Sequence, residues 1–135
     1  MATTTVLFPW KEAYSVRIPR IDTQHKGLVT LINDLHAAML EGRAKEAMSH
    51  IVDELVDYTV QHFAFEESML RQYGYSALAQ HQLLHKELCS QVVELRDKFR
   101  AGKITVTIET MQFLKNWLSS HILSADMAYA RELKP

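Results

Sequence analysis

The chain has 135 residues, the usual size of one domain that buries its own hydrophobic core. Its 15 basic and 16 acidic residues give a formal net charge of -1, which excludes the strongly basic surface of proteins that bind nucleic acid or anionic membranes. The single cysteine, Cys89, excludes an internal disulfide, and its apolar helical neighbours favour a buried, unreactive thiol.

The N-terminal stretch, residues 1–20, predicts an extended arm. It contains Pro9 and Pro19, and its apolar and polar residues follow no regular period. Trp10 and Tyr14 are the side chains expected to anchor it. The first ten residues are uncharged, but they are too few to span a bilayer and lack the basic start of a signal peptide. We therefore expect a cytoplasmic protein without membrane insertion.

Three helix-length segments follow the arm. Apolar residues recur every three or four positions in residues 22–41, 44–72 and 76–101, so each segment predicts an amphipathic helix. Asp22 is the predicted N-cap of the first helix. Each predicted helix ends at a glycine, and these are Gly42, Gly74 and Gly102.

A fourth helix is predicted after residue 104, because Thr105 and Thr107 can each serve as its N-cap. Its apolar stripe runs at helical spacing from Ile108 to Ala125. Residues 104–108 are rich in β-branched side chains and could instead form a strand, but a single strand would have no partner. The helical interpretation is therefore preferred.

The connections between these helices are short, so sequence neighbours must run antiparallel. The predicted fold is all-α, an up-down-up-down four-helix bundle with the extended N-terminal arm laid across it. Residues 1–135 then form one domain, with the arm in residues 1–20 and the bundle in residues 21–135.

Two pairs of polar residues lie on the apolar stripes of the predicted helices. His62 and Glu66 are four residues apart, as are His81 and His85, so each pair projects from one face of its helix. A single interior histidine is usually a hydrogen-bonded core residue. Four such groups without partners, however, would be costly to bury. Shared ligation of a metal removes that cost, and the combination therefore indicates a metal site.

Residues from the first and fourth helices extend this set. His25 lies on the apolar stripe of the first helix, and His121 and Asp126 lie in the fourth. A step of five residues would turn Asp126 about 140° away from His121 on a regular helix, so the helix must loosen locally or the carboxylate must reach around. Taken alone, Asp126 would be interpreted as a solvated surface residue.

The number of ligands predicts two metal ions. Five imidazoles and two carboxylates exceed the four ligands of a tetrahedral zinc site. With two bridging carboxylates and a bridging solvent oxygen, a metal with three histidines is six-coordinate, and one with two histidines keeps a vacancy for a small ligand. Imidazole and carboxylate ligands without thiolate suit iron, manganese or zinc better than copper(I), and the choice among these three stays open.

The remaining polar and aromatic candidates receive weaker assignments. His36 and His50 lack an interior partner four residues away and are interpreted as surface or boundary residues. Glu67 points away from Glu66 and is expected to be solvated or to support a ligand. Tyr58, Trp117 and Tyr129 could line the site, but aromatic packing in the core is sufficient to explain their presence.

Four motifs together resemble the hemerythrin family in its bacterial single-domain form. They are Asp22-Thr-Gln-His25, His62-Phe-Ala-Phe-Glu66-Glu67, His81-Gln-Leu-Leu-His85 and His121-Ile-Leu-Ser-Ala-Asp126. The resemblance covers essentially the whole chain, including the Pro9-Trp10 arm and the five-residue step to Asp126. No ligand position departs from the family motif.

The resemblance implies a non-haem di-iron centre. One iron would be held by His81, His85 and His121 and the other by His25 and His62, with Glu66, Asp126 and an oxo or hydroxo group bridging them. It also implies that O2 binds end-on at the vacancy of the two-histidine iron. By motif position the oxygen pocket would be formed by Leu28, Phe63, Trp117, Leu118, Ile122 and Tyr129.

The expected function is reversible O2 binding for storage, transport or delivery, without enzymatic activity. Small anions such as azide are expected as inhibitory ligands, and an oxygen-consuming enzyme is a possible recipient. A di-iron oxidase or peroxidase is the alternative, but the Glu-x-x-His repeats of ferritin-like oxidases are absent from the sequence. A sensor of O2 or redox state would need a separate partner to read its state.

Overall fold

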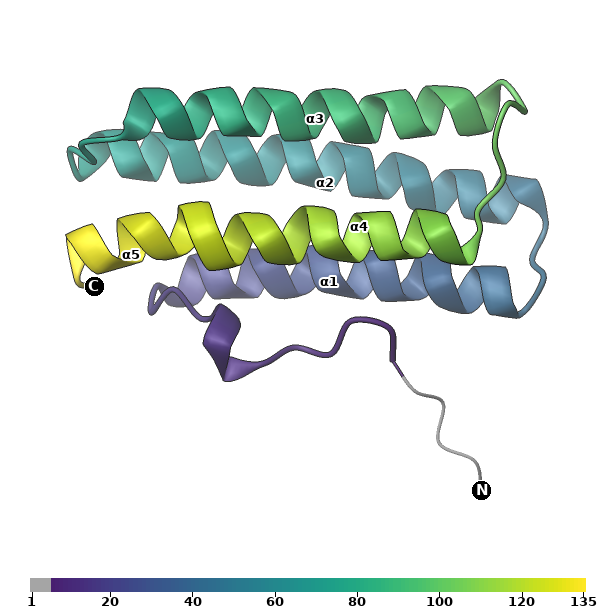
Figure 1. The fold of residues 1–135 in the computed structure, drawn as a ribbon, viewed down its shortest axis with the longest axis horizontal. Coiled ribbons are helices and arrows are strands. Elements are labelled where there is room, and N and C mark those ends of the chain that lie inside the picture. Colours follow the sequence, from purple (N-terminus) through teal and green to yellow (C-terminus); the bar gives the residue numbers. More distant parts are fainter. Residues whose placement is uncertain (1–5) are drawn as a thin grey trace.

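Four long helices lie side by side in the computed structural model, which describes residues 6–135 (Figure 1). Their connections alternate between the two ends of the bundle, so the predicted all-α, up-down-up-down architecture is confirmed. The fourth helix continues through a π-helical turn, η2, into a short α5. The elements in chain order are η1 (Glu12–Tyr14), α1 (Pro19–Leu40), α2 (Lys45–Gln72), α3 (Leu78–Arg100), α4 (Ile108–His121), η2 (Ile122–Asp126) and α5 (Met127–Leu133).

The first helix begins earlier than predicted, and the assignment of Asp22 as its N-cap is wrong. Pro19 is the first helical residue, because its fixed φ suits a first turn and its missing N–H would have no partner there. Asp22 lies inside the helix and ties the arm to it. Its carboxylate accepts hydrogen bonds from the backbone N–H of Val16 at 2.9 Å and the hydroxyl of Ser15 at 2.6 Å.

The start of the fourth helix agrees with the sequence. Thr107 is the N-cap of α4, and its hydroxyl accepts a hydrogen bond from the backbone N–H of Thr110 at 3.3 Å. Residues 104–107 form an irregular connection, so the strand interpretation was correctly set aside.

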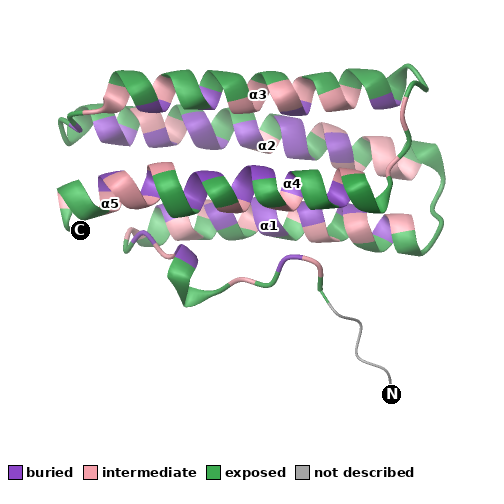
Figure 2. Ribbon diagram, viewed as in Figure 1, coloured by how far each residue is buried: buried purple, intermediate pink, exposed green. Residues whose placement is uncertain are grey.

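Buried residues recur along every long helix between exposed ones (Figure 2). The buried apolar side chains form two clusters. The larger includes Phe8, Leu28, Leu118 and Ile122, and the smaller is built from Val16, Ile21, Met69, Leu70, Tyr75 and Tyr129. No helix in residues 6–135 is long and apolar enough to cross a membrane.

The arm is anchored more deeply than the sequence indicated. Tyr14 is buried and packs against Trp10, as expected, but Phe8 is fully buried within the larger cluster. Asn33 on α1 binds both backbone groups of Phe8. Its Oδ1 accepts from the Phe8 N–H at 3.0 Å, and its Nδ2 donates to the Phe8 carbonyl at 2.9 Å. The division into one domain with an arm in residues 1–20 stays a prediction, since residues 1–5 lie outside the described part.

Replacing Asn33 by Ala should lower the free energy of unfolding by about 1–3 kcal/mol, because two backbone groups of Phe8 lose their partner. Denaturant unfolding followed by circular dichroism measures this change. Asn116, exposed on α4, supplies the control, and Asn116→Ala should leave stability nearly unchanged. Equal effects from the two substitutions would show that the arm adds no stability through Asn33.

Candidate metal centre

The structure brings the seven predicted ligand side chains together in the interior of the bundle. His25 comes from α1, His62 and Glu66 from α2, His81 and His85 from α3, His121 from α4 and Asp126 from η2. Each of these residues is between 0% and 7% exposed. Their nitrogen and oxygen atoms form two overlapping groups able to hold metal ions, and Glu66 belongs to both.

The π-helical turn explains how Asp126 reaches this group. In η2 the helix widens over Ile122–Asp126, which brings residues five apart onto a common face. Asp126 Oδ1 consequently lies 3.1 Å from His121 Nε2. The local loosening expected from the five-residue step is therefore present.

Glu66 spans two sets of histidines. Its Oε1 lies 2.7 Å from His81 Nε2 and 3.0 Å from His85 Nε2. Its Oε2 lies 3.4 Å from His62 Nε2 and 3.6 Å from His25 Nε2. One oxygen thus faces histidines of α3, and the other faces histidines of α1 and α2.

Asp126 divides its oxygens in a similar way. Its Oδ1 lies 3.2 Å from His81 Nε2 and 3.1 Å from His121 Nε2, while Oδ2 lies 3.1 Å from His25 Nε2. The two carboxylates therefore connect a set of three histidines with a set of two.

Several polar atoms in the cluster are buried without a partner, and they show whether the cluster is suited to hold a metal. His25 Nε2, His85 Nε2, His121 Nε2 and both carboxylate oxygens of Asp126 are buried without a hydrogen-bond partner. Such atoms are costly to bury unless another ligand engages them. All of them point into one cluster of imidazole and carboxylate groups, the donor set that suits iron, manganese or zinc. The residues fit a metal centre.

The electrostatics of the protein without metal show how strongly these groups interact. Burial by itself would lower the pKa of His25 and of His81, but the Asp126 and Glu66 carboxylates raise both values to about 9. Burial lowers the pKa of His62 despite its contact with Glu66. Burial alone would raise the pKa of Glu66, and the surrounding histidines hold it well below its usual range.

Three side chains outside the ligand set contact it directly. His85 Nδ1 lies 2.8 Å from Glu67 Oε2, so Glu67 supports a predicted ligand. His62 Nδ1 lies 2.6 Å from Gln24 Oε1. Phe63 stacks on the His85 ring with centroids 3.8 Å apart and planes inclined by 4°. Sequence reasoning recognised Gln24 only as part of a motif, because no local spacing relates it to residue 62.

The residues predicted to form the oxygen pocket are all buried, but they occupy different surroundings. Leu28, Trp117, Leu118 and Ile122 belong to the larger apolar cluster. Phe63 covers His85, as described above. Tyr129 lies in the smaller cluster, and its hydroxyl donates a hydrogen bond to Glu66 Oε2 at 3.1 Å. Tyr129 therefore contacts a predicted bridging ligand and lies outside the cluster that holds Leu28, Trp117, Leu118 and Ile122.

The other polar candidates are not part of the cluster of seven residues. His50 is exposed and pairs with Glu54 at 2.8 Å, and His36 is half-buried, so their assignment as surface or boundary residues is confirmed. Tyr58 lines a surface pocket of about 290 Å³ between α1 and α2, beside Gln24 and His62. Cys89 is half-buried rather than fully buried.

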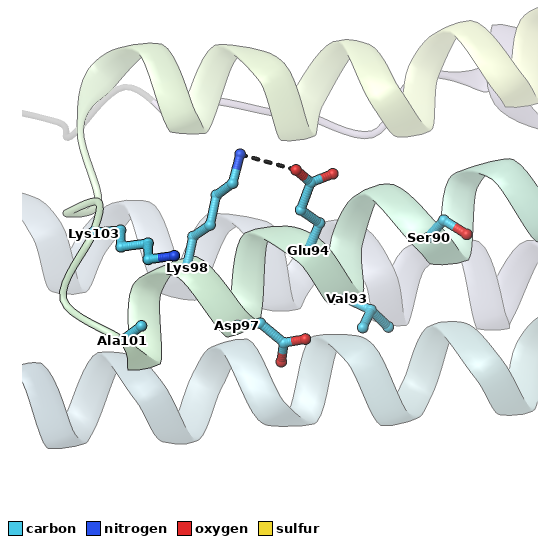
Figure 3. A pocket seen from close by; sticks show the side chains of 7 residues that line it. All are labelled: Ser90, Val93, Glu94, Asp97, Lys98, Ala101 and Lys103. Carbon is cyan, nitrogen blue, oxygen red and sulfur yellow. Dashed lines mark ion pairs between the residues drawn. The ribbon is translucent and has the colours of Figure 1, made fainter.

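A second surface pocket, of about 500 Å³, lies near the C-terminal end of α3 (Figure 3). Lys98 pairs there with Glu94 at 2.9 Å, and the lining contains none of the seven clustered residues. This pocket is therefore separate from the metal centre.

Comparisons with known proteins agree on one family. The family model described as the hemerythrin HHE cation binding domain matches residues 16–133. The bacteriohemerythrin of Stenotrophomonas maltophilia (strain R551-3) is 36% identical over 95% of this chain and 82% of its own length. That of Methylococcus capsulatus (strain ATCC 33009 / NCIMB 11132 / Bath) is 33% identical over 91% of this chain and 94% of its own. A crystal structure of wild-type hemerythrin superposes with a TM-score of 0.87 at 32% identity, covering 96% of this chain and 99% of that one.

Replacing His85 by Ala should remove metal from the three-histidine set, because one of its nitrogen donors is lost. Elemental analysis of the purified protein measures the metal retained per chain. His50→Ala is the matched control, since His50 is an exposed histidine outside the cluster. A similar metal content in the two variants would contradict the assignment of His85 as a ligand.

Proposed function

This chain belongs to the hemerythrin family, and we propose that it binds O2 reversibly at a pair of non-haem iron ions. The observation that carries the proposal is the division of five imidazoles into sets of three and two, with Glu66 and Asp126 contacting both sets. This arrangement suits two ions that share two bridging carboxylates. Reversible binding would serve oxygen storage, transport or delivery.

The two sets would hold the irons unequally. His81, His85 and His121 would hold one iron, and His25 and His62 would hold the other, with a solvent-derived oxygen as a third bridge. The three-histidine set with these bridges would supply six donors and the two-histidine set five, which would leave one open position. The iron pair, when bound, supplies that position and the electrons that O2 requires.

The apolar residues around this centre would keep water and anions away from it. Leu28, Leu118 and Ile122 are at most 2% exposed and pack in the same cluster as Trp117. Exclusion of water would favour release of intact O2, because solvent access promotes side reactions that would leave the iron oxidised and inactive. Phe63 holds the plane of the His85 imidazole by stacking on it.

An oxidase or peroxidase is the second candidate. The buried group contains two carboxylates and five histidines, and few acidic side chains are available inside it to deliver protons to a reacting oxygen. This composition favours the carrier over the enzyme. Delivery to an oxygen-consuming enzyme, or sensing through a separate partner, remains compatible with the same site.

Reduced protein should take up a stoichiometric amount of O2 for each iron pair and release it when oxygen is removed. Repeated cycles of aeration and deoxygenation, followed by the charge-transfer absorption band, test this expectation. Catalytic consumption of O2 in the presence of a simple reductant would contradict the carrier proposal and favour the oxidase. Retention of one iron, or of zinc despite ample iron, would contradict the di-iron centre itself.

Replacing Leu118 by Ala should accelerate both oxidation to the diferric state and azide binding. Leu118 precedes His121 by one helical turn and is 2% exposed, so truncation opens space beside the centre. Stability should fall by ~2–5 kcal/mol while both irons are retained, because no ligand changes. Leu114→Ala, which truncates a buried leucine one turn farther from His121, controls for general loss of packing. Unchanged oxidation and azide rates in Leu118→Ala would show that Leu118 serves packing alone.

A further inference from the structure

We infer that hydrogen bonds from outside the ligand set make the two metal positions unequal, so that the three-histidine position binds iron more tightly and favours its ferric state. The inference rests on the proposed di-iron function and concerns the roles of Glu67, Gln24 and Tyr129 as positioning residues. Three separate contacts carry it.

The first contact supports the three-histidine position with a negative charge. The Nδ1–H of His85 donates to Glu67 Oε2 at 2.8 Å, and the Glu67 side chain is 25% exposed. A carboxylate that accepts this hydrogen bond raises the basicity of the opposite ring nitrogen, Nε2, which would bind the metal. His85 is therefore a strong donor, and a strong donor stabilises the higher charge of ferric iron.

The second contact gives the two-histidine position a neutral partner. The Nδ1–H of His62 donates to the amide oxygen Oε1 of Gln24 at 2.6 Å. An amide carries no net charge and polarises the imidazole less than a carboxylate does. His25, the other histidine of this set, has a buried Nδ1 without any hydrogen-bond partner. Neither imidazole of this set thus receives support from a negative charge at Nδ1.

The third contact acts on a bridging carboxylate. The hydroxyl of Tyr129 donates to Glu66 Oε2, the oxygen that faces His25 and His62, at 3.1 Å. A hydrogen bond to this oxygen withdraws electron density from the side of Glu66 that would bind the two-histidine iron. Glu66 Oε1, which faces His81 and His85, is not the acceptor of that bond.

Together the contacts favour the three-histidine position: Glu67 strengthens the donor His85, Gln24 gives His62 only the smaller support of a neutral acceptor, and Tyr129 weakens the oxygen of Glu66 that faces the two-histidine position. The iron next to the vacancy is then the more readily released and the more readily returned to the ferrous state.

Stepwise removal of iron from the diferrous protein by a ferrous chelator tests the inference. Mössbauer spectra identify the iron that remains, since five- and six-coordinate ferrous ions differ in quadrupole splitting. In the parent protein, the two-histidine iron should leave in the first phase. Glu67→Gln keeps the shape and an acceptor oxygen but removes the charge, and it should accelerate the second phase 10–100-fold while leaving the first unchanged.

Two further variants act on the other position. Gln24→Glu should slow the first phase, because His62 gains a carboxylate acceptor. Tyr129→Phe should slow it as well, because Glu66 Oε2 recovers electron density. The matched controls are Glu87→Gln and Gln112→Glu, which make the same charge changes at exposed positions and should reproduce the parent rates.

Three results would overturn the inference: equal acceleration of both phases in Glu67→Gln, identical rates in Glu67→Gln and Glu87→Gln, or first release from the three-histidine position of the parent. Equal acceleration would indicate simple loosening of the site, which a merely structural role predicts. If the parent fails to hold two irons, the proposed function fails. If the parent holds two irons and binds O2 reversibly, but the rates of the two release phases are the same in the variants as in the parent, only the present inference fails.

Discussion

Seven ionisable side chains buried in an apolar interior are the constraint on which the rest of this structure depends. Five imidazoles and two carboxylates with at most 7% exposure would be costly to bury singly, because each loses its hydration. Their grouping offsets the cost only if every long helix presents a donor at one level of the bundle. That requirement explains why polar pairs four residues apart interrupt the apolar stripes of α2 and α3, and why α4 departs from regular geometry beside His121.

The apolar packing of the N-terminal arm is continuous with the packing around the candidate metal centre. Phe8 from the arm lies in one cluster with Leu28, Leu118 and Ile122, so attachment of the arm and closure of the proposed oxygen pocket belong to a single packing unit. Asn33 fixes the position of Phe8 through both backbone groups of that residue. The arm therefore contributes to the wall of the bundle, although its residues contain no ligand.

Local periodicity predicted the four helices, their order and six of the seven clustered residues, because spacing on a helix determines which face a side chain occupies. Asp126 does not follow that spacing, and its place in the cluster rested on the other six residues and on the resemblance of the five-residue step to the family motif. Contacts between distant residues were not predictable in this way. Phe8 and Asn33 are 25 residues apart, and His62 and Gln24 are 38 apart. The N-cap at Asp22 was misplaced because the preference of Pro19 for the first helical position outweighed the capping preference of aspartate.

The π-helical turn connects the centre with its surroundings. Without the added width of η2, a step of five residues would leave Asp126 about 140° from His121 around the helix axis, too far to share the site. The same widening resets the orientation of every residue that follows. Tyr129 comes three positions after Asp126, and in this register its hydroxyl reaches Glu66 Oε2. One irregular turn thus places one buried carboxylate of the cluster and also aims a hydrogen bond at the other. Because α5 carries the buried ring of Tyr129 into the smaller apolar cluster, the irregular turn and the apolar packing together fix the direction of this hydrogen bond.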